Sequence, residues 1–293
     1  MSKAKYYIAS FRLRTLPLSM SGIFLGTFLA ALDGFFSWHP FLLALATTLN
    51  LQILSNLANE LGDLQKGTDN EDRLGPIRSI QSGALSLKEF KRTIGIFILL
   101  SIISGSALVY AAFDSLFSKD GVIMLLLGAA AIIAAIKYTV GKNAYGYRGL
   151  GDLFVFLFFG LLSVMGSYFL MTHQVNPWVF LPASAIGMLS AGVLNLNNMR
   201  DMDNDRHCGK ITIPVMIGIK AAKVYHFVLI IGGIACMTIY TAMHPASSYW
   251  YLITLPLFVM HLSKVARYTG RDLDSQLKVL SLSTLFLALA VGL

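Results

Sequence analysis

The chain has 293 residues, of which 56% are hydrophobic and only 13% are charged. Soluble globular domains carry about 25% charged residues, so the composition excludes an ordinary soluble domain and indicates an integral membrane protein. The net charge of +8 needs no nucleic-acid partner, because membrane proteins keep basic residues in the loops of one face. Two cysteines, Cys208 and Cys236, are too few for a disulfide framework.

Apolar stretches that approach the ~20 residues of a membrane-spanning helix recur along the whole chain. They lie at 16–32, 40–60, 94–113, 121–138, 152–171, 178–198, 224–243 and 248–265. A ninth begins near residue 277 and runs to Leu293, which is short for a full crossing. The sequence therefore predicts an all-α integral membrane protein with nine transmembrane helices.

Loop charge predicts the orientation of these helices. With the N-terminus in the cytoplasm and a crossing at each stretch, every Lys and Arg except Lys119 falls on the cytoplasmic side. Basic residues are enriched in cytoplasmic loops, so we expect a cytoplasmic N-terminus. The expected location is the inner (cytoplasmic) membrane, with the polar clusters described next facing the cytoplasm.

A polar cluster follows the second predicted helix, with the sequence NLANELGDLQKGTDNEDRLGPIRSIQSG at 56–83. Asn59 and Asp63 are four residues apart and share one helical face, which Asn56 extends by nearly one turn. Polar and ionisable side chains at a membrane helix end are costly to bury and indicate a functional cavity. A solvated loop flank is the alternative interpretation.

A second cluster, NLNNMRDMDNDRHCGK at 195–210, repeats this pattern. Asn197 and Asp201 follow Asn59 and Asp63 at one offset, since 197 − 59 and 201 − 63 both equal 138. Asp205 continues the same face by another turn. The repeat predicts an internal duplication, so that the single domain 1–293 consists of two halves, about 1–140 and 141–293.

These clusters have the composition of a site for a metal ion and a phosphate group. Aligned carboxylates repel unless a cation lies between them, and carboxylate and amide oxygens are ligands that Mg²⁺ prefers. In the first cluster Arg73 and Arg78 follow the acidic residues, and arginine suits bidentate recognition of phosphate. Retention of positive charge on the cytoplasmic side is the alternative explanation for each arginine.

A third polar segment, KYTVGKNAYGYRGLGD, spans 137–152. Tyr138 can present an aromatic face to a cationic intermediate, and Lys142 and Arg148 can bind phosphate. Asp152 begins the fifth predicted helix, where a carboxylate also favours the helix N-terminus. That helix is rich in Phe and Met, which suits either a lipid-facing surface or a cavity for an isoprenoid chain. Arg12, before the first helix, is interpreted as an anchor at the membrane interface.

The chain resembles the UbiA superfamily of intramembrane prenyltransferases, and within it the branch that prenylates 1,4-dihydroxy-2-naphthoate. The resemblance is carried by QILSNLANELGD and KGTDNEDRLGPIRS at 52–79, YGYRGLGD at 145–152 and LNNMRDMDNDRHCGK at 196–210. It implies nine transmembrane helices in a UbiA-like bundle around a central cavity, with two Asp-rich motifs at the cytoplasmic ends of the second and sixth helices. Gly67 stands where the superfamily has its second aspartate, and the next carboxylate is Asp69.

The resemblance also implies residue roles. The implied metal ligands for Mg²⁺ are Asn59, Asp63, Asp69, Asp201 and Asp205. The implied substrate-binding residues are Asn56, Asn59, Lys66, Arg73, Arg78, Lys142, Asn197 and Lys210. The implied catalytic residues are Asp63, Tyr138, Arg148, Asp152 and Asp201.

The implied reaction is Mg²⁺-dependent transfer of a polyprenyl group from polyprenyl diphosphate to 1,4-dihydroxy-2-naphthoate. Carbon dioxide and diphosphate leave, and the product is demethylmenaquinol, in menaquinone biosynthesis. The expected partners are these two substrates and the lipid bilayer, with no nucleic acid. One alternative is a member of the superfamily acting on 4-hydroxybenzoate, homogentisate or a haem precursor. Another is a cation-coupled secondary transporter, although basic residues beside the carboxylates oppose cation binding.

Overall fold

The computed structural model describes residues 3–244 and 248–292, which form a bundle of helices. The long helices are α2 (Leu16–Leu32), α3 (Trp38–Gln65), α4 (Leu87–Phe113), α5 (Lys119–Lys137), α8 (Phe180–Arg200), α10 (Ile213–Met243), α11 (Leu255–Arg267) and α12 (Asp274–Ala290). One further rod joins α6 (Gly151–Val155), the π-helix η3 (Phe156–Met165) and α7 (Gly166–Thr172). The short helices include α1 (Lys3–Phe11) and α9 (Met202–His207).

Eight helical segments within the described residues are long and apolar enough to cross a membrane, so the prediction of an all-α membrane protein is confirmed. The stretch predicted at 248–265 is not among the eight. It forms the short helix η5 (Trp250–Thr254) and α11, and α11 ends in a turn that carries Lys264 and Arg267.

The prediction that the last helix is short was wrong. The crossing segment there runs over Gly270–Ala290, which is 21 residues. A 3₁₀ turn, η6 (Gly270–Leu273), leads directly into α12. The apolar pattern located the start near residue 277 because the first turn of α12 is polar, with Asp274, Ser275 and Gln276.

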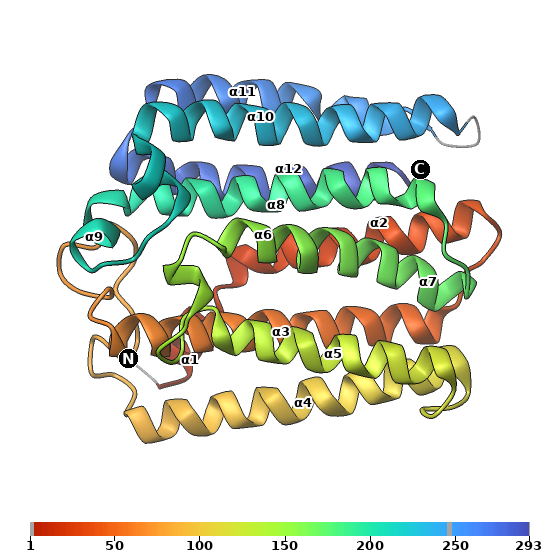
Figure 1. The fold of residues 1–293 in the computed structure, drawn as a ribbon, viewed down its shortest axis with the longest axis horizontal. Coiled ribbons are helices and arrows are strands. Elements are labelled where there is room, and N and C mark those ends of the chain that lie inside the picture. The colour runs from red at the N-terminus through yellow and green to blue at the C-terminus, as the bar shows by residue number, and fades with distance from the viewer. Residues whose placement is uncertain (1–2, 245–247, 293) are drawn as a thin grey trace.

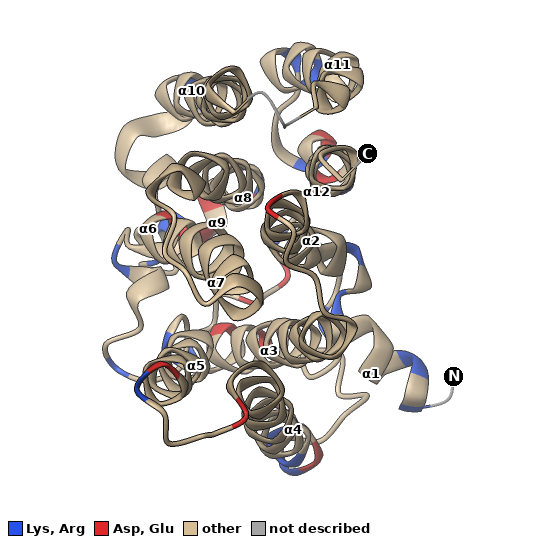
Figure 2. Ribbon diagram, turned by 90° about the vertical axis from the view of Figure 1, so that its right-hand side faces the viewer, with Lys and Arg blue, Asp and Glu red and all other residues tan. Residues whose placement is uncertain are grey.

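The rods lie side by side and roughly antiparallel (Figure 1). The N-terminus, α1, the end of α3 and α9 lie at one end of the bundle, here called the motif end, and the C-terminus lies at the other. Seen along the helices, α4 lies beyond α3 and α5 at one edge, and α10 and α11 lie beyond α8 and α12 at the opposite edge (Figure 2). Between these edges, α2 contacts α3, α8, α12 and η3.

Small residues allow the central helices to approach closely, as is common between membrane helices. A Cβ atom at Gly26 of α2 would lie 2.2 Å from the backbone oxygen of Val164 in η3. A Cβ atom at Gly187 of α8 would lie 2.7 Å from Cδ2 of Phe156, also in η3. Glycine at these two positions therefore lets η3 pack closely against both α2 and α8, which positions the wall of the cavity described below.

Candidate active site

A cavity of about 340 Å³ lies between α2, α3, α5, α8 and the α6–η3–α7 rod. Towards the motif end it is lined by amide and carboxylate side chains. These are Asn59, Asp63, Asn197, Asp201 and Asp205. Deeper in the bundle the wall is apolar, with Phe154, Phe158, Phe159 and Leu162. One cavity thus joins a charged end to an aromatic and aliphatic interior.

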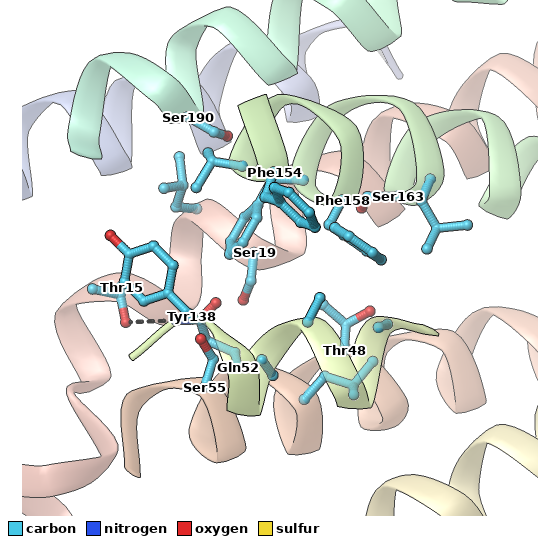
Figure 3. Close-up of a pocket in the computed structure, with 18 of the residues that line it drawn as sticks. Thr15, Ser19, Thr48, Gln52, Ser55, Tyr138, Phe154, Phe158, Ser163 and Ser190 are labelled. Carbon is cyan, nitrogen blue, oxygen red and sulfur yellow. Dashed lines mark hydrogen bonds between the residues drawn. The ribbon is translucent and has the colours of Figure 1, made fainter. Parts of the chain in front are cut away.

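The close-up shows how these walls face one another (Figure 3). Phe154 and Phe158 project into the cavity from the α6–η3 rod, and their rings are nearly parallel, with centroids 6.1 Å apart. Tyr138, Gln52 and Thr15 line the same cavity. Gln52 Nε2 donates a hydrogen bond to Thr15 Oγ1 at 3.3 Å. The aromatic residues of the fifth predicted helix therefore line the cavity.

The structure brings the two Asp-rich clusters together through shared basic residues. Lys210 Nζ lies 3.8 Å from Asp63 Oδ1 and 3.6 Å from Asp205 Oδ1. Arg73 Nε lies 3.2 Å from Asp69 Oδ1, and its Nη2 lies 3.6 Å from Asp201 Oδ2. Each cation thus joins one carboxylate of the first cluster to one of the second, so both clusters face the same cavity.

Tyr147 and Arg200 orient the carboxylates of Asp63 and Asp201. Tyr147 donates a 2.7 Å hydrogen bond from its hydroxyl to Asp63 Oδ1. The buried Arg200 forms a bidentate pair with Asp201, from Nε to Oδ1 at 3.0 Å and from Nη2 to Oδ2 at 2.6 Å. Arg200 also pairs through Nη1 with Asp274 at the start of α12. Asp63 and Asp201 are therefore held by hydrogen bonds to their own surroundings.

Burial and neighbouring charges shift the pKa values of Asp201, Asp205 and Lys210 in different directions. Burial raises the pKa of Asp205 to about 6, against the opposing influence of Lys210. Burial also tends to raise the pKa of Asp201, but the hydrogen bonds and charge of Arg200, together with the charges of Arg73 and Lys210, outweigh burial and lower the pKa. For Lys210, burial is outweighed by Asp63 and Asp205, so its pKa is raised. Lys210 is therefore charged at neutral pH, and Asp205 is protonated more readily than Asp201.

The donor set fits Mg²⁺ held together with a phosphorylated ligand. Oδ2 of Asp69 and Oδ2 of Asp205 are buried without a hydrogen-bond partner in the described chain, and Oδ1 of Asp69 has only its ion pairs with Arg73 and Arg78. Over the same residues, no three Asp, Glu, His or Cys side chains are close enough to hold an ion by themselves. Mg²⁺ is commonly bound by one or two carboxylates plus substrate phosphates and water. These aspartates suit that mode.

Nine of the residues predicted from the sequence line the cavity. They are Asn59, Asp63, Arg73, Arg78, Tyr138, Asn197, Asp201, Asp205 and Lys210. Asp69 is buried behind them and lies 3.6 Å from Arg78 Nε as well as close to Arg73. The helical face expected for Asn197, Asp201 and Asp205 persists across the break between α8 and α9, because the backbone hydrogen bonds at Asp201 and Asp205 keep helical spacing.

The structure does not bring five predicted site residues to the cavity wall. Asn56 donates to the Phe11 carbonyl at 2.9 Å and holds the turn before α2. Lys66 lies over the Tyr147 ring at 3.8 Å. Lys142 is exposed. The other two are Arg148, which is also exposed and donates to Asn143, and Asp152, which is buried and accepts a 3.3 Å hydrogen bond from Tyr225.

Sequence reasoning missed Arg12, which lines the cavity. Its backbone is left-handed, with φ 50° and ψ 58°, a conformation that costs a non-glycine residue about 1–2 kcal/mol. Asn56 and Thr15 stabilise this turn, with Thr15 donating to the Arg12 carbonyl at 2.8 Å from its backbone nitrogen. The turn depends on contact with α3, so no local pattern in the sequence could have identified it.

Comparison with known proteins shows similarity to one family of membrane enzymes along nearly the whole chain. Residues 19–290 match the model of the UbiA prenyltransferase family. The chain is 45% identical to a 1,4-dihydroxy-2-naphthoate octaprenyltransferase of Escherichia coli, covering 94% of this chain and 88% of that relative.

Two solved structures share the fold. A UbiA homologue from Aeropyrum pernix has a TM-score of 0.71 at 20% identity, over 94% of this chain and 96% of that one. A UbiA homologue from Archaeoglobus fulgidus bound to GPP and Mg²⁺ has a TM-score of 0.61 at 17% identity, over 96% of this chain and all of that one. The family model matches nearly the whole chain, and the fold and its cavity agree with that match. The chain therefore belongs to the UbiA prenyltransferase family.

Proposed function

We propose that this chain transfers a polyprenyl group from polyprenyl diphosphate to 1,4-dihydroxy-2-naphthoate, with loss of carbon dioxide and diphosphate. The observation that carries the proposal is the single cavity that joins paired aspartates and basic residues to an aromatic interior. The Escherichia coli relative, named for this acceptor, supports the choice of substrate.

The charged end suits the diphosphate of the donor. Asp63, Asp69, Asp201 and Asp205, with Asn59, would hold Mg²⁺, which when bound neutralises part of the diphosphate charge. Arg73, Arg78 and Lys210 each lie near a carboxylate and can move to bind phosphate oxygens. These residues stabilise the negative charge that develops as the bond between the prenyl carbon and the diphosphate oxygen breaks.

The apolar interior suits the allylic end of the prenyl chain. Phe154 and Phe158 pack along the hydrocarbon and exclude water, which would otherwise capture the allylic cation. The Tyr138 ring can face that cation. A ring carbon of the naphthoate then forms the new bond to the prenyl carbon. As the carboxylate leaves as carbon dioxide, the electron pair of the broken carbon–carbon bond stays in the ring and restores its aromaticity, so that no net proton is consumed or released.

The proposal includes the location. We place the protein in the inner membrane with the motif end facing the cytoplasm. In this orientation every Lys and Arg except Lys119 falls on the cytoplasmic side, as the enrichment of basic residues in cytoplasmic loops predicts. A cytoplasmic acceptor and a membrane-dissolved donor can then both reach the cavity.

Purified protein incubated with octaprenyl diphosphate, 1,4-dihydroxy-2-naphthoate and Mg²⁺ should form the prenylated naphthoquinol. Chelation with EDTA should abolish the product, and added Mg²⁺ should restore it. Product formed from 4-hydroxybenzoate but not from dihydroxynaphthoate would contradict the proposed acceptor. Retention of full activity in EDTA would contradict the proposed metal.

A further inference from the structure

A chain of hydrogen bonds joins Thr68, Tyr147 and Asp63 at the motif end. The Tyr147 hydroxyl donates to Asp63 Oδ1 at 2.7 Å and lies 2.6 Å from Thr68 Oγ1. A phenol has one hydrogen to donate, and Tyr147 uses it on the carboxylate, so Thr68 is the donor to Tyr147. All three residues are buried, which keeps water from competing for these bonds.

The end of α3 places Thr68 in this chain. The helix closes in a Schellman motif, in which the backbone nitrogen of Gly67 donates to the Leu64 carbonyl at 3.1 Å and that of Thr68 donates to the Asp63 carbonyl at 2.9 Å. Gly67 has φ 72°, a conformation that favours glycine. Gly67 stands where the UbiA superfamily has its second aspartate, so in this chain a turn that presents the Thr68 hydroxyl replaces that carboxylate.

Two contacts tie the Thr68 and Tyr147 pair to the second Asp-rich cluster. The backbone nitrogen of Ile211 donates to the Tyr147 carbonyl at 3.3 Å, and that of Gly149 donates to the Ile211 carbonyl at 2.7 Å. Asn204 of α9 donates from Nδ2 to the Thr68 carbonyl at 2.8 Å. The pair is therefore fixed from the backbone as well as through its hydroxyl groups, and it joins all three polar segments of the chain.

A neutral donor holds Asp63, whereas a cation holds Asp201. Arg200 occupies both carboxylate oxygens of Asp201 in an ion pair. Asp63 accepts from Tyr147 at Oδ1, its ion pair with Lys210 Nζ is longer, at 3.8 Å, and within the described residues no hydrogen bond reaches its Oδ2. A hydroxyl group thus fixes the Asp63 carboxylate without cancelling its charge, which suits a ligand for Mg²⁺.

We propose that Thr68 and Tyr147 are positioning residues, which hold Oδ1 of Asp63 so that Oδ2 remains available to Mg²⁺. This inference rests on the proposed function for the metal. Neighbours that orient a ligating group commonly change metal affinity by 10- to 100-fold when they are replaced. Loss of either hydroxyl group lets the carboxylate turn, and so weakens Mg²⁺ binding without removing a ligand.

The test measures Mg²⁺ binding without turnover. Thermal unfolding in detergent is followed as Mg²⁺ is titrated at a fixed, low concentration of inorganic pyrophosphate. Tyr147→Phe removes the hydroxyl group but keeps the ring over which Lys66 lies, and it should raise the Mg²⁺ concentration at half-maximal stabilisation by about tenfold or more.

A matched control removes a similar bond far from the motif end. The Tyr168 hydroxyl donates to Asp33 Oδ2 at 2.6 Å, at the end of α2. Tyr168→Phe therefore loses one hydrogen bond from tyrosine to aspartate, and it should leave the Mg²⁺ midpoint unchanged even if the melting temperature falls. A role of Tyr147 in stability alone would give the same result for both variants, and an unchanged Mg²⁺ midpoint in Tyr147→Phe would overturn the inference.

Variants of Thr68 test the chain independently, including the case in which Tyr147→Phe does not fold. Thr68→Val removes the hydroxyl group at nearly constant volume and should raise the Mg²⁺ midpoint, whereas Thr68→Ser keeps the hydroxyl group and should bind Mg²⁺ as wild type does. Because Thr68 acts through Tyr147, adding Thr68→Val to Tyr147→Phe should cause no further shift. Equal Mg²⁺ midpoints for Thr68→Val and Thr68→Ser, or a further shift of full size in the double variant, would contradict the chain.

Kinetics separate this inference from the proposed function. In Tyr147→Phe the Mg²⁺ concentration for half-maximal prenyl transfer should rise about tenfold, while kcat at saturating Mg²⁺ stays within about threefold and the KM for dihydroxynaphthoate is unchanged. A loss of kcat that saturating Mg²⁺ does not restore would overturn the inference. A wild-type protein that binds Mg²⁺ with pyrophosphate but does not prenylate dihydroxynaphthoate would contradict the proposed acceptor and leave the binding test decisive. A wild-type protein that shows no response to Mg²⁺ would overturn both.

Discussion

Lys210 lies within 4 Å of carboxylates from both Asp-rich clusters, and Arg73 does the same for Asp69 and Asp201. The sequence predicts that a cation separates these carboxylates, and in the structure side chains of the protein occupy that place. Basic residues that neutralise the site in this way are positioned to transfer their interactions to a diphosphate when it binds.

Loss of this charge compensation should be measurable without substrate. Lys210→Met leaves Asp63 and Asp205 without their shared cation, and breaking a buried ion pair costs about 3–5 kcal/mol. Thermal unfolding in detergent should therefore begin at a clearly lower temperature than for wild type. Lys220→Met, at an exposed position of α10, is the matched control and should leave the melting temperature unchanged. Equal melting temperatures for wild type and Lys210→Met would refute the bridging role.

Loss of Asp63 or Asp201 should reduce prenyl transfer, whereas loss of the neighbouring Asp203 should not. Asp63→Asn and Asp201→Asn each remove a charge from the cavity wall, and we expect prenyl transfer to fall at least about 100-fold, the order seen when one preorganised electrostatic group is lost. Asp203 belongs to the same cluster but is exposed, so Asp203→Asn should retain wild-type turnover. The measurement is product formation at saturating Mg²⁺, and similar losses in all three variants would contradict the assignment.

Among the helices, α3 and α8 were the most predictable from the sequence. Each is a long apolar run that ends in an Asn and Asp pair, and both pairs line the cavity. By contrast, the pattern could not determine which face of the fifth predicted helix meets the cavity, because Phe and Met suit lipid and cavity equally well. It also could not orient Asn56, which shares a helix with Asn59 but contacts the turn before α2.

Close contact between central helices should make Gly26 intolerant of a side chain. Gly26→Ala places a methyl group against the Val164 carbonyl, and we expect a loss of about 1–3 kcal/mol of stability from overpacking. Gly95 of α4 has no atom within 4 Å of its would-be Cβ, so Gly95→Ala should be neutral or stabilise the helix by about 0.5–1 kcal/mol. Thermal unfolding of the two purified variants tests the contrast, which fails if both shift alike.

The molecule as a whole retains the order expected from an internal duplication. Adding 138 to the bounds of α2 gives 154–170, within the rod Gly151–Thr172, and adding it to those of α3 gives 176–203, around α8. The duplication stays a prediction. The two polar clusters were predictable because they interrupt an apolar background, whereas the turn that brings Arg12 to the cavity was not, since it depends on contact with Asn56 of α3.

Orientation in the membrane can be tested on whole cells. In a background with Cys208→Ser and Cys236→Ser, Lys119→Cys should react with an impermeant maleimide in intact spheroplasts. Arg206→Cys, at the motif end in α9, should react only after the membrane is permeabilised. Both positions are exposed, so a difference reflects sidedness rather than burial. Labelling of Arg206→Cys in intact spheroplasts would reverse the proposed orientation.

The π-helix η3 has a consequence for how this protein tolerates changes of length. A π-helix closes its hydrogen bonds one residue later than an α-helix, so the segment contains a surplus residue relative to a regular rod. Deleting one residue within Phe156–Met165 would remove this surplus and allow an α-helix to form with the residues beyond it on the same face, whereas the same deletion in a regular α-helix turns everything beyond it by about 100°. Ser167 and Leu170, which line the far part of the cavity, would then keep their orientation, so homologous chains that keep this cavity can differ by one residue between Asp152 and Leu170 where an α-helix replaces the π-helix.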